Sequence, residues 1–164
     1  MKTTEITGLN TQRTVEVVNA LQQLLSDFQV HYTNLRHLHW FVKGHSFFIM
    51  HEKYEELYDD AAEKVDEVAE RILQLDGAPE SRFSVYLKTA RVAELDGVAN
   101  GREAIGYVLD ALRTLIADER QVLQKAAEAD DEVTVALMSD YLRAQEKTAW
   151  MLTAFSTHCK EEKP

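Results

Sequence analysis

The sequence contains one cysteine, Cys159, among its 164 residues, so no disulfide can form within the chain. A chain without disulfides suits a reducing compartment. The N-terminal residues also lack an apolar stretch of signal-peptide length, and no apolar run approaches the length of a membrane span. We therefore expect a cytoplasmic protein without a membrane segment.

Proline and glycine are also scarce: there are two prolines, Pro79 and Pro164, and six glycines. Because proline breaks helices and glycine weakens them, long helices can form almost everywhere else. The hydrophobic and charged fractions, 45% and 28%, are ordinary for a globular protein, and the length is that of one domain. We expect a single domain over residues 1–164, with residues 1–10 as a short flexible segment.

Basic residues are outnumbered by acidic ones, with 18 Lys and Arg against 28 Asp and Glu and a net charge of −10. Such a balance argues against a basic surface for nucleic acid or for an anionic membrane. It is compatible with cations as ligands.

Apolar residues recur at steps of three and four over most of the chain, which predicts amphipathic helices. The first helix begins at Asn10 or Thr11 and ends at Lys43-Gly44. The second begins near Ser46 and ends at Gly77-Ala78-Pro79. The core-facing positions of the two helices are Val17, Leu21, Leu24, Phe28, Leu35 and Leu38, then Met50, Tyr54, Leu57, Ala61, Val65, Val68, Ile72 and Leu75.

Two further long helices follow a connection over residues 77–100, which is too long for a tight turn and holds one short helix around Val85-Tyr86-Leu87. The third long helix runs from about Arg102 to Ala127. Asp130-Asp131 closes it and caps the fourth, whose inward residues include Leu152 and Phe155. Four long helices with one long crossover predict an all-α, ferritin-like four-helix bundle.

Five side chains of metal-binding type share one side of the first two helices. On a helical projection from His51, Glu55 falls at about 40°, Asp66 at about 60° and Glu70 at about 100°, beside the apolar face. His39 lies on a core-facing row of the first helix and can approach His51 across the turn at Gly44. The candidate ligands are His39, His51, Glu55, Asp66 and Glu70.

The spacing of these ligands predicts a site shared between two subunits. Glu55 and Asp66 are eleven residues apart, or roughly 16 Å along a helix, whereas a metal–ligand bond is about 2 Å long. One ion therefore cannot contact both pairs of one chain. An antiparallel two-fold pairing of the second helix would bring His39, His51 and Glu55 of one subunit to Asp66 and Glu70 of another. Imidazole and carboxylate ligands without thiolate suit iron or another divalent first-row metal, zinc included.

The alternative for each acidic pair is ordinary solvated surface charge, and Glu70-Arg71 could be such a pair. The other histidines have plainer roles: His31 as a packed or hydrogen-bonded core residue, and His37 and His45 as surface or turn residues. His158 lies near the end of the chain.

The segment HLHWFVKGHSFFIMHEKYEELYDDAAEKVDEVAERILQLDG, residues 37–77, resembles the Dps family of miniferritins. The resemblance rests on His39-Trp40, a glycine turn, His51 twelve residues after His39, and Asp66-x-x-x-Glu70-Arg71. It implies a cage of twelve identical subunits with ferroxidase centres at two-fold interfaces. The implied ligands are His39, His51, Asp66 and Glu70, with Glu55 where the family usually has Asp.

The implied activity is oxidation of Fe(II) by hydrogen peroxide or oxygen, with storage as a ferric mineral that protects the cell and its DNA. Trp40 matches a family tryptophan that lies beside the site and intercepts radicals; its alternative is simple packing. Asp130, Asp131 and Glu132 lie where entry pores could be, and their alternative is helix capping.

Family members that bind DNA use a lysine-rich tail, which the termini here lack: the N-terminal ten residues hold only Lys2, and the C-terminal KEEKP is balanced in charge. This argues against direct DNA binding. Two other functions stay open: a scaffolding or DNA-protecting cage without turnover, and a hemerythrin-like metal-binding bundle suggested by His51-x-x-x-Glu55. The Glu-x-x-His motifs of large ferritins are absent.

Overall fold

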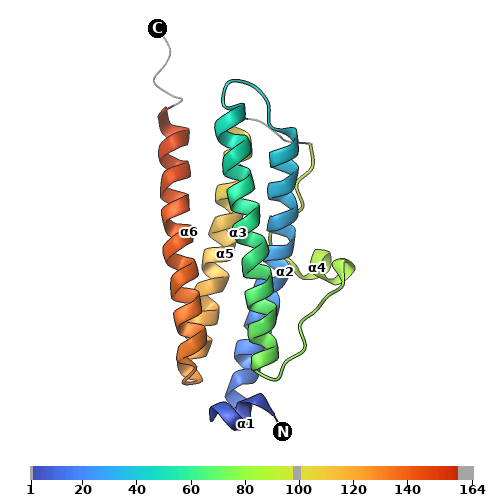
Figure 1. Cartoon of the computed structure of the whole chain (residues 1–164), viewed down its shortest axis with the longest axis vertical. Helices are drawn as coiled ribbons and strands as arrows, with labels where there is room; N and C mark the ends of the chain where they lie inside the picture. Colours follow the sequence, from blue (N-terminus) through green and yellow to red (C-terminus); the bar gives the residue numbers. More distant parts are fainter. Residues whose placement is uncertain (1, 98–100, 159–164) are drawn as a thin grey trace.

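The computed structural model describes residues 2–97 and 101–158 and shows six helices and no strand among them. The four long helices lie side by side as a bundle, and a short helix stands beside the bundle in the crossover (Figure 1). The predicted all-α four-helix bundle with its long crossover is therefore confirmed. The helices are α1 (Thr3–Thr7), α2 (Thr11–Phe41), α3 (Phe47–Gln74), α4 (Phe83–Thr89), α5 (Gly101–Glu128) and α6 (Glu132–His158).

The predicted ends of α2 are confirmed to within a few residues. The Asn10 side chain caps the helix, since its Oδ1 accepts hydrogen bonds from the backbone N–H groups of Gln12 (2.9 Å) and Arg13 (3.3 Å). The helix ends at Phe41, before Gly44, which has a φ of +90°. Glycine adopts this left-handed backbone without strain, so the chain can reverse into α3.

The end of α3 depends on close packing at Gly77. A Cβ atom there would lie 2.8 Å from both Ile72 Cγ2 and Val18 Cγ1. The Gly77 N–H also donates to the Ile72 carbonyl over 2.9 Å. Only a residue without a side chain fits between α2 and the end of α3.

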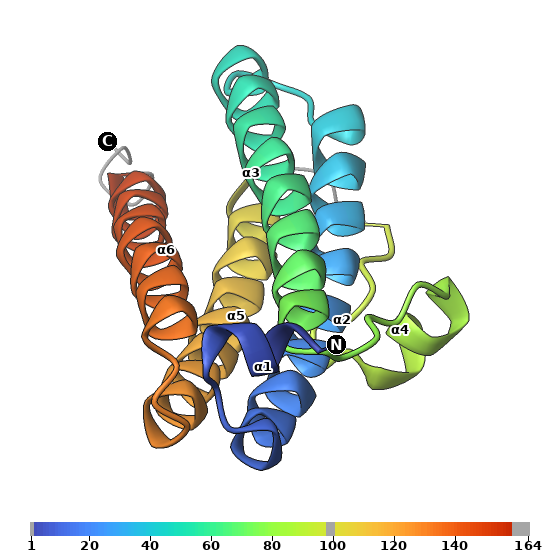
Figure 2. The same ribbon diagram turned by 60° about the horizontal axis from the view of Figure 1, so that its bottom comes forward.

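Within the N-terminal segment that the sequence analysis expected to be flexible, Thr3–Thr7 form α1. This helix lies across the base of the bundle (Figure 2). Thr4 is buried, and the Asp76 carboxylate accepts hydrogen bonds from Thr3 N (2.8 Å), Thr4 N (3.0 Å) and Thr4 Oγ1 (2.5 Å). The sequence prediction missed this contact because Asp76 is 72 residues from Thr4.

The core-facing rows predicted for α2 and α3 are buried or partly buried. One residue of α6 differs from its prediction: Phe155 was expected to face inward, but it is 36% exposed. It borders an open groove between α3 and α6 that is also lined by Ile49 and Met151. No helix of the described residues is both long and apolar enough to cross a membrane. Cys159 and the C-terminal KEEKP lie outside the described residues.

Candidate metal centre

The two predicted histidine ligands lie against each other where α2 ends and α3 begins. Their rings are stacked, with centroids 3.8 Å apart and planes 20° apart. His39 Nδ1 lies 2.8 Å from the backbone carbonyl oxygen of His51, and His51 Nδ1 lies 2.9 Å from that of His39. The pair is therefore fixed by two reciprocal hydrogen bonds across the turn.

These bonds determine which ring nitrogens can bind a metal. A carbonyl oxygen can only accept, so each Nδ1 must carry a proton and donate it. In a neutral imidazole the other nitrogen, Nε2, then has its lone pair free for a cation. Carbonyl groups that fix the tautomer in this way are the usual supports of metal-binding histidines.

Glu55, one turn after His51 on α3, is exposed and accepts a long hydrogen bond of 3.4 Å from the Tyr58 hydroxyl. The Tyr58 ring meets the His39 ring edge to face, with centroids 5.3 Å apart. Partial burial, and next the Glu55 carboxylate, raise the pKa of Tyr58. Tyr58 therefore stays a protonated donor that contacts two of the candidate ligands.

Asp66 and Glu70 lie further along α3, and both are exposed. Within the described part of one chain, no three His, Cys, Asp or Glu side chains come together as a metal-binding group. The structure thus brings His39 and His51 together, places Glu55 one turn further along α3, and leaves Asp66 and Glu70 beyond it on the same helix.

An aromatic cluster that the sequence analysis did not predict surrounds the histidine pair. Tyr58 packs edge to face on Tyr32 with centroids 6.1 Å apart. The Arg36 guanidinium lies over both Tyr32 (5.3 Å) and Trp40 (4.7 Å). Trp40 itself is 61% exposed, so it does not pack in the core of its own chain. The spacing of the tyrosines from the histidines could have indicated this cluster, since Tyr32 precedes His39 by seven residues, or two helical turns, and Tyr58 follows His51 by seven.

His31 and His45 fit their predicted plain roles, whereas His37, predicted at the surface or in a turn, is partly buried on α2. His31 is buried, and desolvation followed by the charge of Lys64 lowers the pKa of His31 to about 4. His45 is exposed in the turn, and His37 is partly buried against Phe41. The side chain of His158 lies outside the described residues.

Asp131 acts as a helix cap, which is the alternative given for it above. Its carboxylate accepts hydrogen bonds from Thr134 N (3.1 Å) and Thr134 Oγ1 (2.6 Å). It also forms a buried ion pair of 2.6 Å with Arg71. The guanidinium of Arg71 is therefore held by the start of α6, whereas its neighbour Glu70 points to solvent.

Comparison with known proteins places this geometry in a family. The model of the ferritin-like domain matches residues 18–161. The chain is 51% identical to the DNA protection during starvation protein of Porphyromonas gingivalis over 95% of this chain and 98% of that protein. It is 36% identical to the DNA protection during starvation protein 2 of Bacillus anthracis over 85% of this chain and 96% of that protein.

Solved structures of Dps proteins have the same fold as this chain. The Dps protein of Vibrio cholerae O1, described as a member of a broad superfamily of ferritin-like diiron-carboxylate proteins, superposes with a TM-score of 0.87 and 44% identity over 90% of this chain and 92% of that one. Dps from Staphylococcus aureus superposes with a TM-score of 0.84 and 30% identity over 90% and 97%. The fold, the family model and the relatives together show that this chain belongs to the Dps family of ferritin-like proteins.

Proposed function

We propose that this protein is a ferroxidase that oxidises Fe(II) at centres shared between two subunits and stores the product as a ferric mineral. The observation that carries the proposal is the reciprocal pair of hydrogen bonds between His39 and His51. These bonds leave the Nε2 lone pair of each imidazole free for a cation before any metal arrives.

The donor set suits iron as a substrate that binds and leaves. Histidine with carboxylate ligands and no thiolate is typical of Fe(II) sites with open positions. Because Glu55, Asp66 and Glu70 are exposed, their carboxylates stay available to a cation. Two Fe(II) ions give up one electron each and hydrogen peroxide takes up both, so peroxide is reduced to water without release of hydroxyl radical. Oxygen is the alternative oxidant.

The second half of the site would come from another copy of the chain. Asp66 and Glu70 are on the same helix as His51, roughly 22 Å and 28 Å away by helical rise. An antiparallel two-fold contact along α3 joins the two halves. Exposed large apolar residues support burial of this surface in an assembly; those near the histidine pair are Trp40, Phe41, Phe48 and Ile49. The family resemblance supports a dodecamer as that assembly.

We further propose that protection of DNA comes through removal of iron and peroxide, with no direct contact with DNA. The net charge of −10 per chain repels a phosphate backbone. A hemerythrin-like function is less suited, because every histidine except His158 falls on α2, on α3 or in the turn between them. The cytoplasmic location stays a prediction.

Ferrous oxidation by peroxide, followed by ferric absorbance, tests the proposed activity. We expect Asp66→Asn, which keeps the size but removes the charge of a ligand, to lower the initial rate at limiting Fe(II) at least about tenfold. The control is Asp140→Asn, because Asp140 is an exposed acid of α6 that forms a surface pair with Arg143 (2.8 Å). Equal rates for the wild type and Asp66→Asn would contradict the proposal.

A further inference from the structure

The apolar core is divided into two separate clusters, one reaching from Val17 to Tyr141 and the other from Leu35 to Leu152. Buried polar side chains from all four long helices lie near this division. His31 of α2, Lys64 of α3 and Gln145 of α6 fall between members of the two clusters along their helices, and Glu119 of α5 accepts a hydrogen bond from the Gln145 amide. We call these four residues the polar layer. Each is at most 5% exposed, and burial of such groups is costly without partners.

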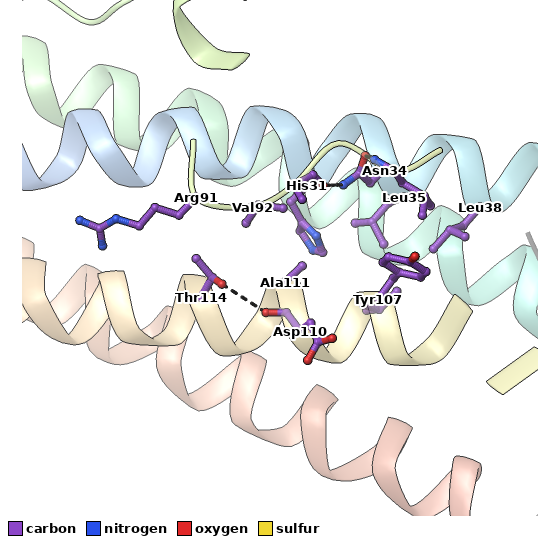
Figure 3. A pocket seen from close by; sticks show the side chains of 13 residues that line it. His31, Asn34, Leu35, Leu38, Arg91, Val92, Tyr107, Asp110, Ala111 and Thr114 are labelled. Carbon is purple, nitrogen blue, oxygen red and sulfur yellow. Dashed lines mark hydrogen bonds between the residues drawn. The ribbon is translucent and has the colours of Figure 1, made fainter. Parts of the chain in front are cut away.

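Two cavities reach this layer from opposite faces of the bundle. The first, of about 230 Å³, lies between α2, α5 and the crossover, where Arg91, Asp110 and His31 line it (Figure 3). The second, of about 190 Å³, lies between α3 and α6, where Asp60 and Gln145 line it. The imidazole of His31 belongs to the wall of both cavities, so it separates them.

The polar atoms of this region are incompletely bonded by protein groups. Among the described residues, four buried side-chain atoms lack a hydrogen-bond partner, and three of them are Asp118 Oδ2, Glu119 Oε2 and Gln145 Oε1. Buried polar atoms nearly always have a partner, and bound water supplies it where the protein does not. Of these three residues Gln145 lines the cavity between α3 and α6, which has room for such water.

Two ion pairs lie beside the polar layer, one on each side of it. On the α3 side Lys64 pairs with Asp60, and on the crossover side Arg91 pairs with Asp118. Burial, and next the neighbouring Asp27, raise the pKa of Asp118 to about 7. Burial raises the pKa of Glu119 to about 8, although Lys64 and the Gln145 amide act against this. Burial lowers the pKa of His31 to about 4, so near neutral pH its imidazole is neutral, with one ring nitrogen that donates a hydrogen bond and one that accepts.

We propose that the polar layer is a hydrated passage that carries protons across the bundle, with His31 and the waters bound to it at the narrowest point. The location of the passage is independent of the metal centre, but its benefit rests on the proposed function. Two Fe(II) ions, one hydrogen peroxide and two waters give two units of FeOOH and four protons. Protons released where a mineral grows inside a closed shell must leave it, and a passage through the wall lets them do so.

Crystal structures of the wild type and of His31→Leu, at a resolution that shows ordered water, test the passage directly. In the wild type we expect water in both cavities within hydrogen-bonding distance of the His31 ring nitrogens. In His31→Leu we expect the chain of waters to be interrupted. Two cavities that are dry next to His31 in the wild type would overturn the proposal, whether or not the protein oxidises iron.

Measuring proton release during iron oxidation tests the proposed role of the passage in carrying protons out of the shell. An external pH indicator and the ferric absorbance are followed together after Fe(II) and peroxide are mixed with the assembled protein. In the wild type and in His45→Leu, a matched change at an exposed histidine, protons should appear together with Fe(III). In His31→Leu they should lag behind it, although the first Fe(II) ions are oxidised at the same rate.

Gln145→Met places an apolar side chain in the layer from α6 and should give the same lag, so the test survives if His31→Leu does not fold. Proton release that follows oxidation without delay in the folded layer variants would overturn the proposed role. A wild type that oxidises no iron would refute the proposed function, and the crystallographic waters would then decide the passage alone.

Discussion

At the scale of single residues, backbone carbonyls control the chemistry of the site. The carbonyl oxygens of His39 and His51 fix both imidazole tautomers, and Tyr58 contacts the ring of His39 and the carboxylate of Glu55. The candidate ligands could be named from residue type and spacing, and they stay a prediction. The reciprocal bonds could not be predicted, because they depend on the turn that brings two backbones together.

Glu119 gives a prediction for the pH dependence of stability. Its pKa is about 8 in the folded chain against an ordinary value of 4.5, so the folded state holds a proton that the unfolded state releases. Stability from this group is fully present below pH 4.5 and is lost as the pH rises towards 8. We expect Glu119→Gln, which mimics the protonated acid, to reduce that loss by on the order of a few kcal/mol.

Urea unfolding at pH 5 and pH 8, at one protein concentration, measures this effect. Glu146→Gln is the control, because Glu146 lies exposed on α6 in a surface pair with Arg120 (2.7 Å). A wild type and a Glu119→Gln variant that lose equal stability between the two pH values would show that Glu119 is ionised in the folded chain.

At the scale of elements, α3 holds the bundle together at both ends and carries four of the five candidate ligands. Its boundaries could be predicted from Ser46 and from Gly77-Ala78-Pro79, because local signals mark helix ends. The contacts of its C-terminal end could not be predicted. Arg71 was considered as surface charge, but it is buried against Asp131 and Thr134, which are 60 or more residues away in sequence.

The Arg71–Asp131 pair should be important for stability. Arg71→Met leaves the Asp131 charge buried without its partner, and we expect a loss of about 3–5 kcal/mol in urea unfolding. Arg13→Met is the control, because it breaks the ion pair between Arg13 and Asp130, which has a similar N–O distance (2.8 Å) but lies exposed on the surface. Its loss of stability should be about 1 kcal/mol at most. Equal losses for the two variants would contradict the assigned role of Arg71.

Acidification should release α1 from the bundle. Hydrogen bonds from the side chain and backbone of Thr4 lower the pKa of Asp76. A carboxyl with a lowered folded pKa stabilises the folded state above its ordinary pKa and loses that effect as the pH falls through the folded value. Amide exchange of Thr3–Thr7, corrected for intrinsic rates, should therefore speed up on acidification in the wild type. Asp76→Asn should abolish this pH dependence; an unchanged dependence would contradict the assignment.

At the scale of the whole molecule, the exposed apolar residues and the separation of the candidate ligands along α3 both support the proposed assembly of several copies of the chain. The bundle could be predicted from periodicity, since helical repeats report which faces are buried. The division of its core by a polar layer could not, because His31, Lys64, Glu119 and Gln145 meet only after the four helices pack.

The most direct measurement is the rate of iron oxidation by a mixed particle assembled from two variants that are each slow alone. His51→Ala damages one half of the proposed centre and Asp66→Ala the other, so each protein alone should oxidise Fe(II) slowly with peroxide. After the two are dissociated and assembled together, a two-fold shared site predicts partial recovery of the wild-type rate, in a particle that elutes far above the 18.7 kDa of one chain. If the wild type is active and the mixed particle stays as slow as its parents, the site lies within one chain and the shared centre is wrong.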